Sequence, residues 1–467
     1  MKAILFATFF FATLSFNSFA LPCEGASGSV FTNPDLSSGG FVADSATVES
    51  SVFLGEDVEV CDTAVLSGNV VIETSNLMKV IIKDNAKISD TVQVSTVQGV
   101  ITIEGNSHIS GSAVVISNGV PIHIREFAKV SDRARIESSS VVGSTFSELL
   151  IEGESFIYED ALISGLTQIV NVDENGSLNL VKAQVYGSAS ISDESSLTGE
   201  AQVFGNANVG GKSTISGQAS IYGNAVIEGD LVSIKDSAQI YGDAEVLDNA
   251  KVENFSKVGG QAVVSGNTQI SDNAMITGQA IIANFSRIFG NAWIFSNAQI
   301  LDKAIVSGEA RVYDSAIIRA NAEVSGVVEI YGNSRVSGRA VVKDNAKIYD
   351  NAKIDGDAIV RDNSIVYANG KVYGHAQVYG SGVVRGNSRV FGYAQVFEEA
   401  NVTSDSQVYG NAQIYGASFL KGSTEAFDNA QIFDDATVDG LSKLHGNVLV
   451  YGSANLVDVD YILGEFY

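Results

Sequence analysis

The sequence predicts an all-β fold built from many short strands joined by tight corners, and one repeating pattern supports this. From Ile234 to Ile462 every sixth residue is Val, Ile or Leu over 39 consecutive positions, Ala426 excepted, with no insertion or deletion. The residue two places earlier is almost always small, and a polar pair such as Gly410-Asn411 separates the units. A six-residue unit of this kind is too short for a helix and suits a strand followed by a corner.

The face of each strand follows from the alternation of side chains. Ala244 and Val246, two places apart, point to the same side of a strand, which must be the buried side. One small and one large apolar residue per unit therefore line the core. Asn and Gly suit the corners because both tolerate positive φ.

The units Ile240–Glu245 and Val408–Gln413 resemble the bacterial hexapeptide-repeat superfamily, whose motif places a small residue four positions after an aliphatic one. The resemblance covers nearly the whole chain after residue 20. It implies a left-handed parallel β-helix, a solenoid with three strands per coil and a coil length of 18, or three units of six. The sequence departs from the motif directly after the aliphatic residue, where Tyr and Phe often replace Gly, Ala or an acid.

Residues 1–20 are typical of a secretory signal. Lys2 precedes an apolar stretch from Ala3 to Leu14, and small residues lead to a cleavage site after Ala20. We therefore expect export to the periplasm, the cell surface or the medium. No transmembrane segment is expected in the mature chain, because no later stretch is apolar enough to cross a bilayer.

The charge of the chain is strongly negative. It has 28 Lys and Arg against 54 Asp and Glu, a net charge of −26, and removal of Lys2 with the signal gives 27 − 54 = −27. Such a charge argues against a nucleic-acid partner.

After the signal, the repeat divides the chain into four parts. We predict an N-terminal cap at 21–41, less regular coils with small corner insertions at 42–233, strictly regular coils at 234–462 and a tail at 463–467. Ile82, Ile103 and Ile124 follow one another at an interval of 21, which predicts three extra residues at one corner. One extra residue before Ile234 predicts a bulge or a widened corner. About 22 coils, spaced by about 4.8 Å, give a rod on the order of 100 Å long.

Cys23 and Cys61 are the two cysteines of the chain. In an oxidising compartment such a pair most often forms one bridge, which would fasten the N-terminal cap to an early coil and contribute about 2–4 kcal/mol. Two buried free thiols are the alternative.

With a coil length of 18, side chains at positions i and i + 18 lie above one another on the outside of the solenoid. On one face a glutamine column then runs beside an aromatic column, while Phe295–Tyr367 and Tyr373–Phe427 carry rings on the other faces. Such columns can simply stabilise parallel in-register strands. The sharper hypothesis is a polysaccharide-binding surface, in which rings offer flat platforms to sugars and amides offer hydrogen bonds. The residues concerned are Gln377, Gln395, Gln413, Gln431, Tyr379, Phe397, Tyr415 and Phe433.

A second column is basic and consists of Arg335, Lys353, Lys371 and Arg389. Stacked cations repel one another, so this column needs neighbouring carboxylates such as Asp355 or an anionic partner. Compensated surface charge and docking of a phosphate- or uronate-bearing polymer both remain open.

Catalysis is a further possibility, because many hexapeptide-repeat proteins are acyltransferases and some are zinc carbonic anhydrases. The four histidines are His108, His123, His375 and His445, and no two are separated by the stacking interval of 18, so we predict no metal site and no cofactor. His445 continues the column of Phe427. His375, at a corner, is a weak candidate for a catalytic base.

We therefore expect an exported, rod-like, non-enzymatic protein that acts as a structural or binding element. The candidate partner is a polysaccharide or another cell-surface component, and the oligomeric state is open. The alternative is a hexapeptide-repeat acyltransferase.

Overall fold

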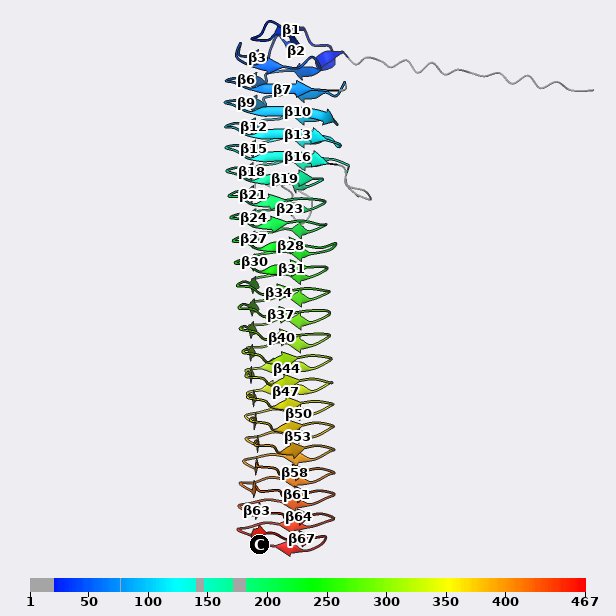
Figure 1. Cartoon of the computed structure of the whole chain (residues 1–467), viewed down its shortest axis with the longest axis vertical. Coiled ribbons are helices and arrows are strands. Elements are labelled where there is room, and N and C mark those ends of the chain that lie inside the picture. The colour runs from blue at the N-terminus through cyan, green and yellow to red at the C-terminus, as the bar shows by residue number, and fades with distance from the viewer. Residues whose placement is uncertain (1–20, 76, 140–146, 171–181) are drawn as a thin grey trace, which may run out of the picture.

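The protein forms a long three-sided tube of short parallel strands (Figure 1). This computed structural model describes residues 21–75, 77–139, 147–170 and 182–467, so the signal predicted for residues 1–20 lies outside the described residues. Among the described residues, the one helical element is the short 3-10 turn η1 (Pro22–Gly25). No helix in these ranges is long and apolar enough to cross a membrane.

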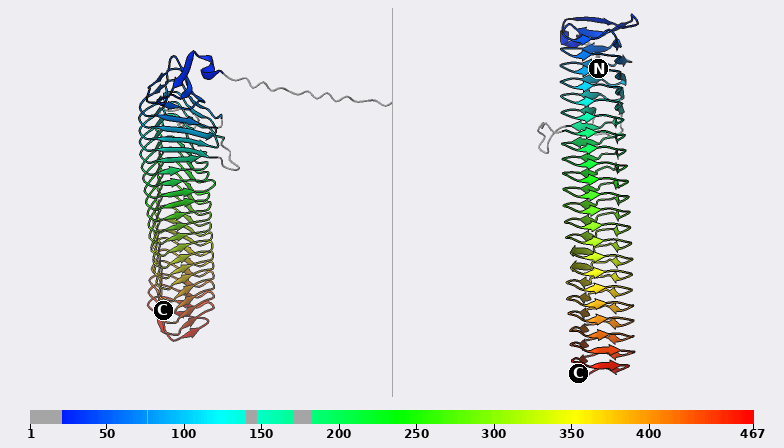
Figure 2. Two further views of the ribbon diagram at one scale, coloured as in Figure 1. Left: turned by 45° about the horizontal axis from the view of Figure 1, so that its top comes forward. Right: turned by 90° about the vertical axis from the view of Figure 1, so that its left-hand side faces the viewer.

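Every third strand belongs to the same wall of the tube. Sheet A runs from β2 (Ser38–Ala43) to β68 (Glu465–Phe466), sheet B from β3 (Thr47–Val48) to β66 (Asn455–Val457), and sheet C from β4 (Phe53–Leu54) to β67 (Asp460–Tyr461). Within the described residues sheet A has 24 strands, of which all but β1 (Gly28–Thr32) are parallel, so the tube has 24 − 1 = 23 coils. Figure 2 shows the strands of each sheet stacked along the rod.

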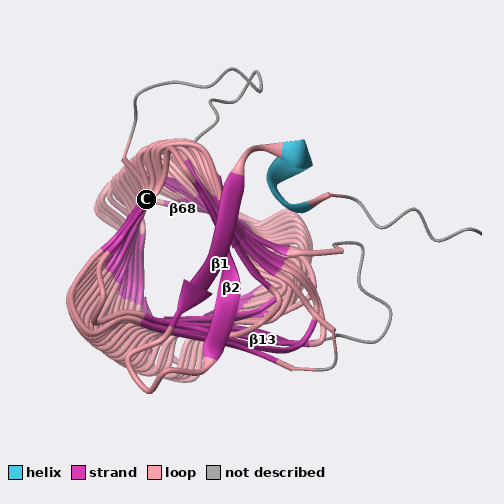
Figure 3. Ribbon diagram, turned by 90° about the horizontal axis from the view of Figure 1, so that it is seen from above, coloured by secondary structure: helices cyan, strands magenta, loops and turns pink. Residues whose placement is uncertain are grey.

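The repeat length is that expected from the sequence. Ile240 pairs with Val258 and Val258 with Ile276, so each coil has three strands and a length of 258 − 240 = 18. Seen from the end, the three sheets enclose a triangle with rounded corners (Figure 3). The predicted all-β parallel solenoid is confirmed.

The core is a single apolar column inside the tube. The aliphatic residue of each unit and the small residue two places earlier are buried along almost the whole length, as for Ala244 and Val246. Each large side chain contributes roughly 1.5–3 kcal/mol through its burial. At several positions where Ser replaces Ala, its hydroxyl donates to the backbone carbonyl three places earlier, as Ser256 does to Glu253 at 2.6 Å.

The two residues of each corner pair have different structural roles, although the sequence suggested positive φ for both Gly and Asn. The first residue, Gly or Asp, has positive φ, as in Asp362 (62°) and Gly374 (72°). Asp at this position also accepts a hydrogen bond from the next coil along the chain. The backbone N–H of Gly380, for example, lies 2.9 Å from the Asp362 carboxylate. The Asn that follows instead forms amide ladders along the rod, such as Asn369 to Asn387 at 2.9 Å.

The irregular coils place their extra residues at corners. Ile103 pairs with both Ile82 and Ile124, which confirms the predicted interval of 21, and the insertions follow β10 (Gln93–Gln98) and β13 (Val114–Asn118) at the corner between sheets C and A. The extra residue before Ile234 widens a corner at which the Leu231 side chain is 67% exposed.

The N-terminal end of the tube is covered by a hairpin. Strands β1 and β2 pair antiparallel, and β1 crosses the open triangle (Figure 3). Asn33 in the hairpin turn is 2% exposed. Its side-chain oxygen accepts a hydrogen bond from the Leu54 N–H at 2.9 Å, and its side-chain nitrogen donates to the Leu54 carbonyl at 3.0 Å. These bonds satisfy backbone groups of β4, which would otherwise form a free edge.

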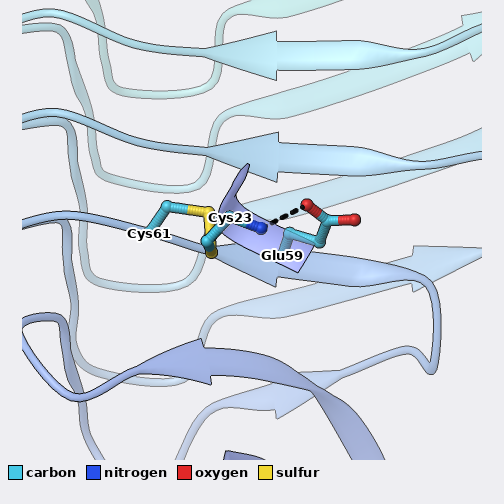
Figure 4. A group of neighbouring side chains, drawn as sticks. All are labelled: Cys23, Glu59 and Cys61. Carbon is cyan, nitrogen blue, oxygen red and sulfur yellow. Dashed lines mark hydrogen bonds between the residues drawn. A yellow bond between two sulfur atoms is a disulfide. The ribbon is translucent and has the colours of Figure 1, made fainter. Parts of the chain in front are cut away.

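The predicted disulfide fastens this cap. Cys23 and Cys61 are bonded, with Cα atoms 5.4 Å apart, so the alternative of two free thiols is wrong. The Cys23 N–H donates to the Glu59 carboxylate at 3.1 Å (Figure 4). Glu59 also pairs with Lys79.

At the C-terminal end the coil shortens. Leu444 pairs with Tyr461 at an interval of 461 − 444 = 17, and Val450 pairs with Phe466 at an interval of 466 − 450 = 16. The rings of Tyr461 and Phe466 stack at 4.2 Å and pack against the core, while Ile462 is 65% exposed. The regular register therefore ends before Ile462, because two aromatic side chains fill the end of the tube, and the predicted tail forms β68.

Candidate functional surface

The predicted glutamine and aromatic columns lie side by side on sheet A. We call them together the Gln–aromatic surface. Each glutamine pairs in register with the next, on β53 (Gln377–Val378), β56 (Gln395–Val396), β59 (Gln413–Ile414) and β62 (Gln431–Ile432). The aromatic residue follows each strand directly, and these glutamines and rings are half-buried. Its residues are Gln377, Gln395, Gln413, Gln431, Tyr379, Phe397, Tyr415 and Phe433.

The rings of this surface are stacked on one another. The centroids of Tyr379, Phe397, Tyr415 and Phe433 are 4.8 Å apart at each step, and the planes differ by 3–6°. The Arg361 guanidinium covers the outer face of Tyr379 at 4.5 Å. Ring faces are thus turned toward neighbouring rings, and ring edges line the surface. The expected flat platforms for sugar rings are therefore not available within the column.

The glutamine column satisfies its own amides only in part. Gln413 donates to Gln395 at 3.2 Å, and Gln431 accepts from the Tyr415 hydroxyl at 3.4 Å. The Gln377 side chain has no hydrogen bond to any residue that the structure describes. The Asn ladders at the corners are more complete than this column, so the glutamines retain hydrogen-bonding capacity for a ligand.

The hydroxyls of this surface are neutral donors at ordinary pH. Burial raises the pKa of Tyr379 and of Tyr415 above the usual value for a phenol. Each hydroxyl can therefore donate one hydrogen bond and accept others without carrying charge.

Three further ring ladders run along the rod. Phe295–Tyr367 lies on sheet B with centroid spacings of 4.8–4.9 Å, and Tyr373–Phe427 lies on sheet C and is extended by His445 at 4.7 Å from Phe427. The third ladder lies in the N-terminal half and was not among the columns predicted from the sequence. It consists of Tyr158, Tyr186, Phe204, Tyr222 and Tyr241.

The missed ladder had a detectable signal. Gln184-Val185-Tyr186 and Gln239-Ile240-Tyr241 have the same order of residue types as Gln377-Val378-Tyr379. Its members follow one another at intervals of 28, 18, 18 and 19 along the chain, so a search at a fixed interval of 18 breaks the ladder.

The predicted basic column is formed on sheet C. Arg335, Lys353, Lys371 and Arg389 pair in register on β46 (Arg335–Val336), β49 (Lys353–Ile354), β52 (Lys371–Val372) and β55 (Arg389–Val390). Among the residues that the structure describes, no carboxylate oxygen lies within 4.0 Å of a side-chain nitrogen of these four residues. Asp355, expected to compensate them, instead accepts a hydrogen bond from Ser337 at 2.9 Å.

Several other cations of the rod are paired one coil away. On sheet B, Lys347 lies 3.0 Å from Glu329 on the preceding coil, and on sheet C, Lys443 lies 3.4 Å from Glu425. Alternating charges of this kind are what register-aligned strands favour. The basic column departs from that arrangement over four consecutive coils.

The histidines do not form a site together. His375 stacks on Tyr393 at 4.8 Å, and its Nδ1 lies 3.5 Å from the Asp357 carboxylate. His108 lies on β12 (His108–Ile109) of sheet B and His123 on β14 (Ile122–Ile124) of sheet A. The one grouping of possible metal ligands among the described residues is Cys23, Glu59 and Cys61, in which the disulfide occupies both sulfurs.

Comparison with protein-family models and with curated proteins finds no match for this chain. The resemblance to the hexapeptide-repeat superfamily is thus not supported by a matching family, and what the structure shows is an architecture of three parallel sheets with a coil length of 18.

Proposed function

We propose that this is an exported, rod-like, non-enzymatic protein that binds a linear polysaccharide along the Gln–aromatic surface. The observation that carries the proposal is the repetition of the same amide and phenol groups on consecutive coils of sheet A. Groups that recur at the strand spacing of about 4.8 Å suit a polymer with a repeating unit.

The chemistry of the surface supports a neutral carbohydrate. Amides with unused hydrogen-bonding capacity can both donate to and accept from sugar hydroxyls, and the neutral phenols of Tyr379 and Tyr415 add further donors. Ring edges between them supply an apolar margin. Contact with sugars is then made through edges and polar groups rather than through ring faces.

The body of the rod supports a structural role in the same setting. The tube, its ring ladders and its disulfide are compatible with a structural protein. A disulfide within the chain fits the periplasm or the outside of the cell.

The alternative of an acyltransferase finds less support. His375 is the candidate base, but its ring is stacked on Tyr393 and its Nδ1 faces Asp357, an arrangement that stabilises the side chain in place. Replacement of His375 by Asn should leave the folding and the polysaccharide binding of the rod unchanged.

The test is retention of the purified chain on neutral polysaccharides and peptidoglycan. Replacement of all four glutamines of the surface by Ala should abolish retention. The matched control replaces Gln269, Gln299 and Gln407, which occupy the same outward strand position in isolation, and should bind like the parent. Equal retention of the fourfold variant and the parent would contradict the proposal.

A further inference from the structure

We propose that the basic column on sheet C is a second binding strip, which takes a linear polysaccharide whose sugars carry carboxylate groups. The inference rests on the proposed placement outside the cytoplasm and adds a ligand class that the Gln–aromatic surface does not explain. Arg335, Lys353, Lys371 and Arg389 form the strip.

The first argument is the local charge. Between residues 335 and 389 the chain has nine basic and five acidic residues, a local formal charge of +4 within a protein whose net charge is −26. Four of the five acids in that stretch are engaged elsewhere: Asp357 with Arg339, Asp362 with the Gly380 N–H, Asp350 with the Ala368 N–H, and Asp344 with the Asp362 N–H. The strip therefore lies in a segment whose formal charge is positive, on a rod that is acidic overall.

The second argument is the cost of stacking four cations. Lys353 faces Arg335 on one side and Lys371 on the other, in register and with no carboxylate between them. Like charges directly opposite one another destabilise paired strands, and the rod avoids this elsewhere, as with Lys443 and Glu425. An anionic ligand lying along the column removes the repulsion and supplies the missing counter-charges.

The third argument is the periodicity. The strip presents one cation per coil, at the strand spacing of about 4.8 Å, along a straight line. A uronate polymer presents one carboxylate per sugar, at a spacing of the same order, so successive carboxylates can meet successive cations. Duplex DNA has about one charge per 1.7 Å and requires a broad basic surface. A chain with a net charge of −26 lacks such a surface.

The fourth argument is the chemistry beside the strip. The column that follows the basic strands on sheet C begins with Ser337 and Asp355 and continues with Tyr373 and Phe391, whose rings stack at 4.9 Å. Burial raises the pKa of the Tyr373 phenol, and the Arg389 cation on the next coil partly offsets this rise. Half of the strip is thus bordered by ring edges that can contact sugar C–H groups, and Asp355 is the one carboxylate on this border.

The experiment measures binding of oligogalacturonate to the full chain over a series of salt concentrations. We expect binding at low salt that weakens steeply as salt is added, because exposed charges are screened. The fourfold variant R335Q/K353Q/K371Q/R389Q should lose about tenfold or more in affinity. D355N should bind more tightly than the parent.

The matched control removes four charges from elsewhere on the rod, with K235Q, K251Q, K257Q and K303Q combined. It changes the net charge equally, so it should keep the affinity of the parent for oligogalacturonate. Equal loss of affinity in both fourfold variants would overturn the proposal by reducing it to net charge. Salt-independent binding, tighter binding of a polyphosphate through the same four residues, or no binding at all would overturn it as well.

Two comparisons separate this proposal from the previous one. A neutral dextran or peptidoglycan ligand should be unaffected by the basic-column variant, and oligogalacturonate should be unaffected by the glutamine variant. If neutral ligands fail to bind while oligogalacturonate binds through the four cations, the Gln–aromatic proposal fails and this one stands.

Discussion

The Tyr409 hydroxyl donates a hydrogen bond to the Glu425 carboxylate at 3.2 Å, joining one coil to the next on sheet C. Burial and this carboxylate together raise the pKa of Tyr409 to about 12. The ring continues the ladder from Phe391 to Phe427, so ring stacking and a polar contact between coils meet at one residue.

Alkaline pH should destabilise the rod through this residue. In the unfolded chain Tyr409 ionises near the ordinary phenol pKa of 10.0, whereas in the fold it holds its proton to about 12. Its contribution to stability is therefore present below pH 10 and is lost as the pH rises through 12. Thermal melting at a series of pH values should show this loss, and Y409F should show a smaller one. A parent and variant with the same pH profile would contradict the assignment.

Reversal of one charge in the basic column should stabilise the fold. In K353E the new carboxylate lies between Arg335 and Lys371, and two repulsions become attractions. We expect a gain of about 1 kcal/mol or less in the free energy of unfolding at low salt, which disappears at high salt. Urea denaturation measures it.

Lys257 provides the control for this change. It has the same outward strand position but pairs with Gln239 and Met275, so K257E should bring no gain. A gain of the same size in both variants would show that the cations of the column do not repel one another.

The two faces of a strand should differ sharply in their tolerance of truncation. Ile348 points into the tube and is fully buried, whereas Ile365 is half-buried on the outside of sheet B, one coil on. I348A should cost about 2–5 kcal/mol, because it leaves a cavity in a narrow core. I365A should cost about 1 kcal/mol or less. Comparable costs in urea denaturation would contradict the assigned strand orientation.

Loss of the disulfide should act on the cap alone. The bond closes a loop with a sequence separation of 38, and its removal in C23S/C61S should cost about 2–4 kcal/mol. In a solenoid each coil contacts only its neighbours, so the effect should fade along the rod. Hydrogen exchange should rise in β1 and β2 and stay unchanged at 335–389. Increased exchange over the whole chain would indicate a cooperative unit larger than the cap.

The regular part of the fold could be predicted from the sequence because the aliphatic residues that recur at every sixth position are the residues buried in the core. Each buried position, such as Val246, needs an aliphatic side chain, and three strands per coil convert a period of six into columns 18 apart. The stacking of Tyr379 on Phe397 and the alignment of Lys353 with Lys371 follow from this interval. The disulfide followed from compartment and cysteine count.

Features set by side-chain orientation and by local register could not be predicted. The sequence places Tyr379 and Phe397 in one column, but the stacking of their faces depends on rotamers that maximise ring contact. Asp355 has the right charge for Lys353, yet its carboxylate bonds to Ser337. At the C-terminal end Tyr461 takes the place predicted for Ile462, because the interval from Leu444 to its partner is 17 instead of 18.

The most direct test of the Gln–aromatic surface is hydroxyl-radical footprinting of the full chain with and without bound polysaccharide. The sheet B rings Tyr313, Tyr331 and Tyr349 form the internal control, since they stack in the same way as Tyr379 and Phe397. We predict that the ligand protects Tyr379, Phe397 and their neighbours on sheet A and leaves the sheet B rings unchanged. Equal protection of both ladders, or protection of neither, would contradict the account.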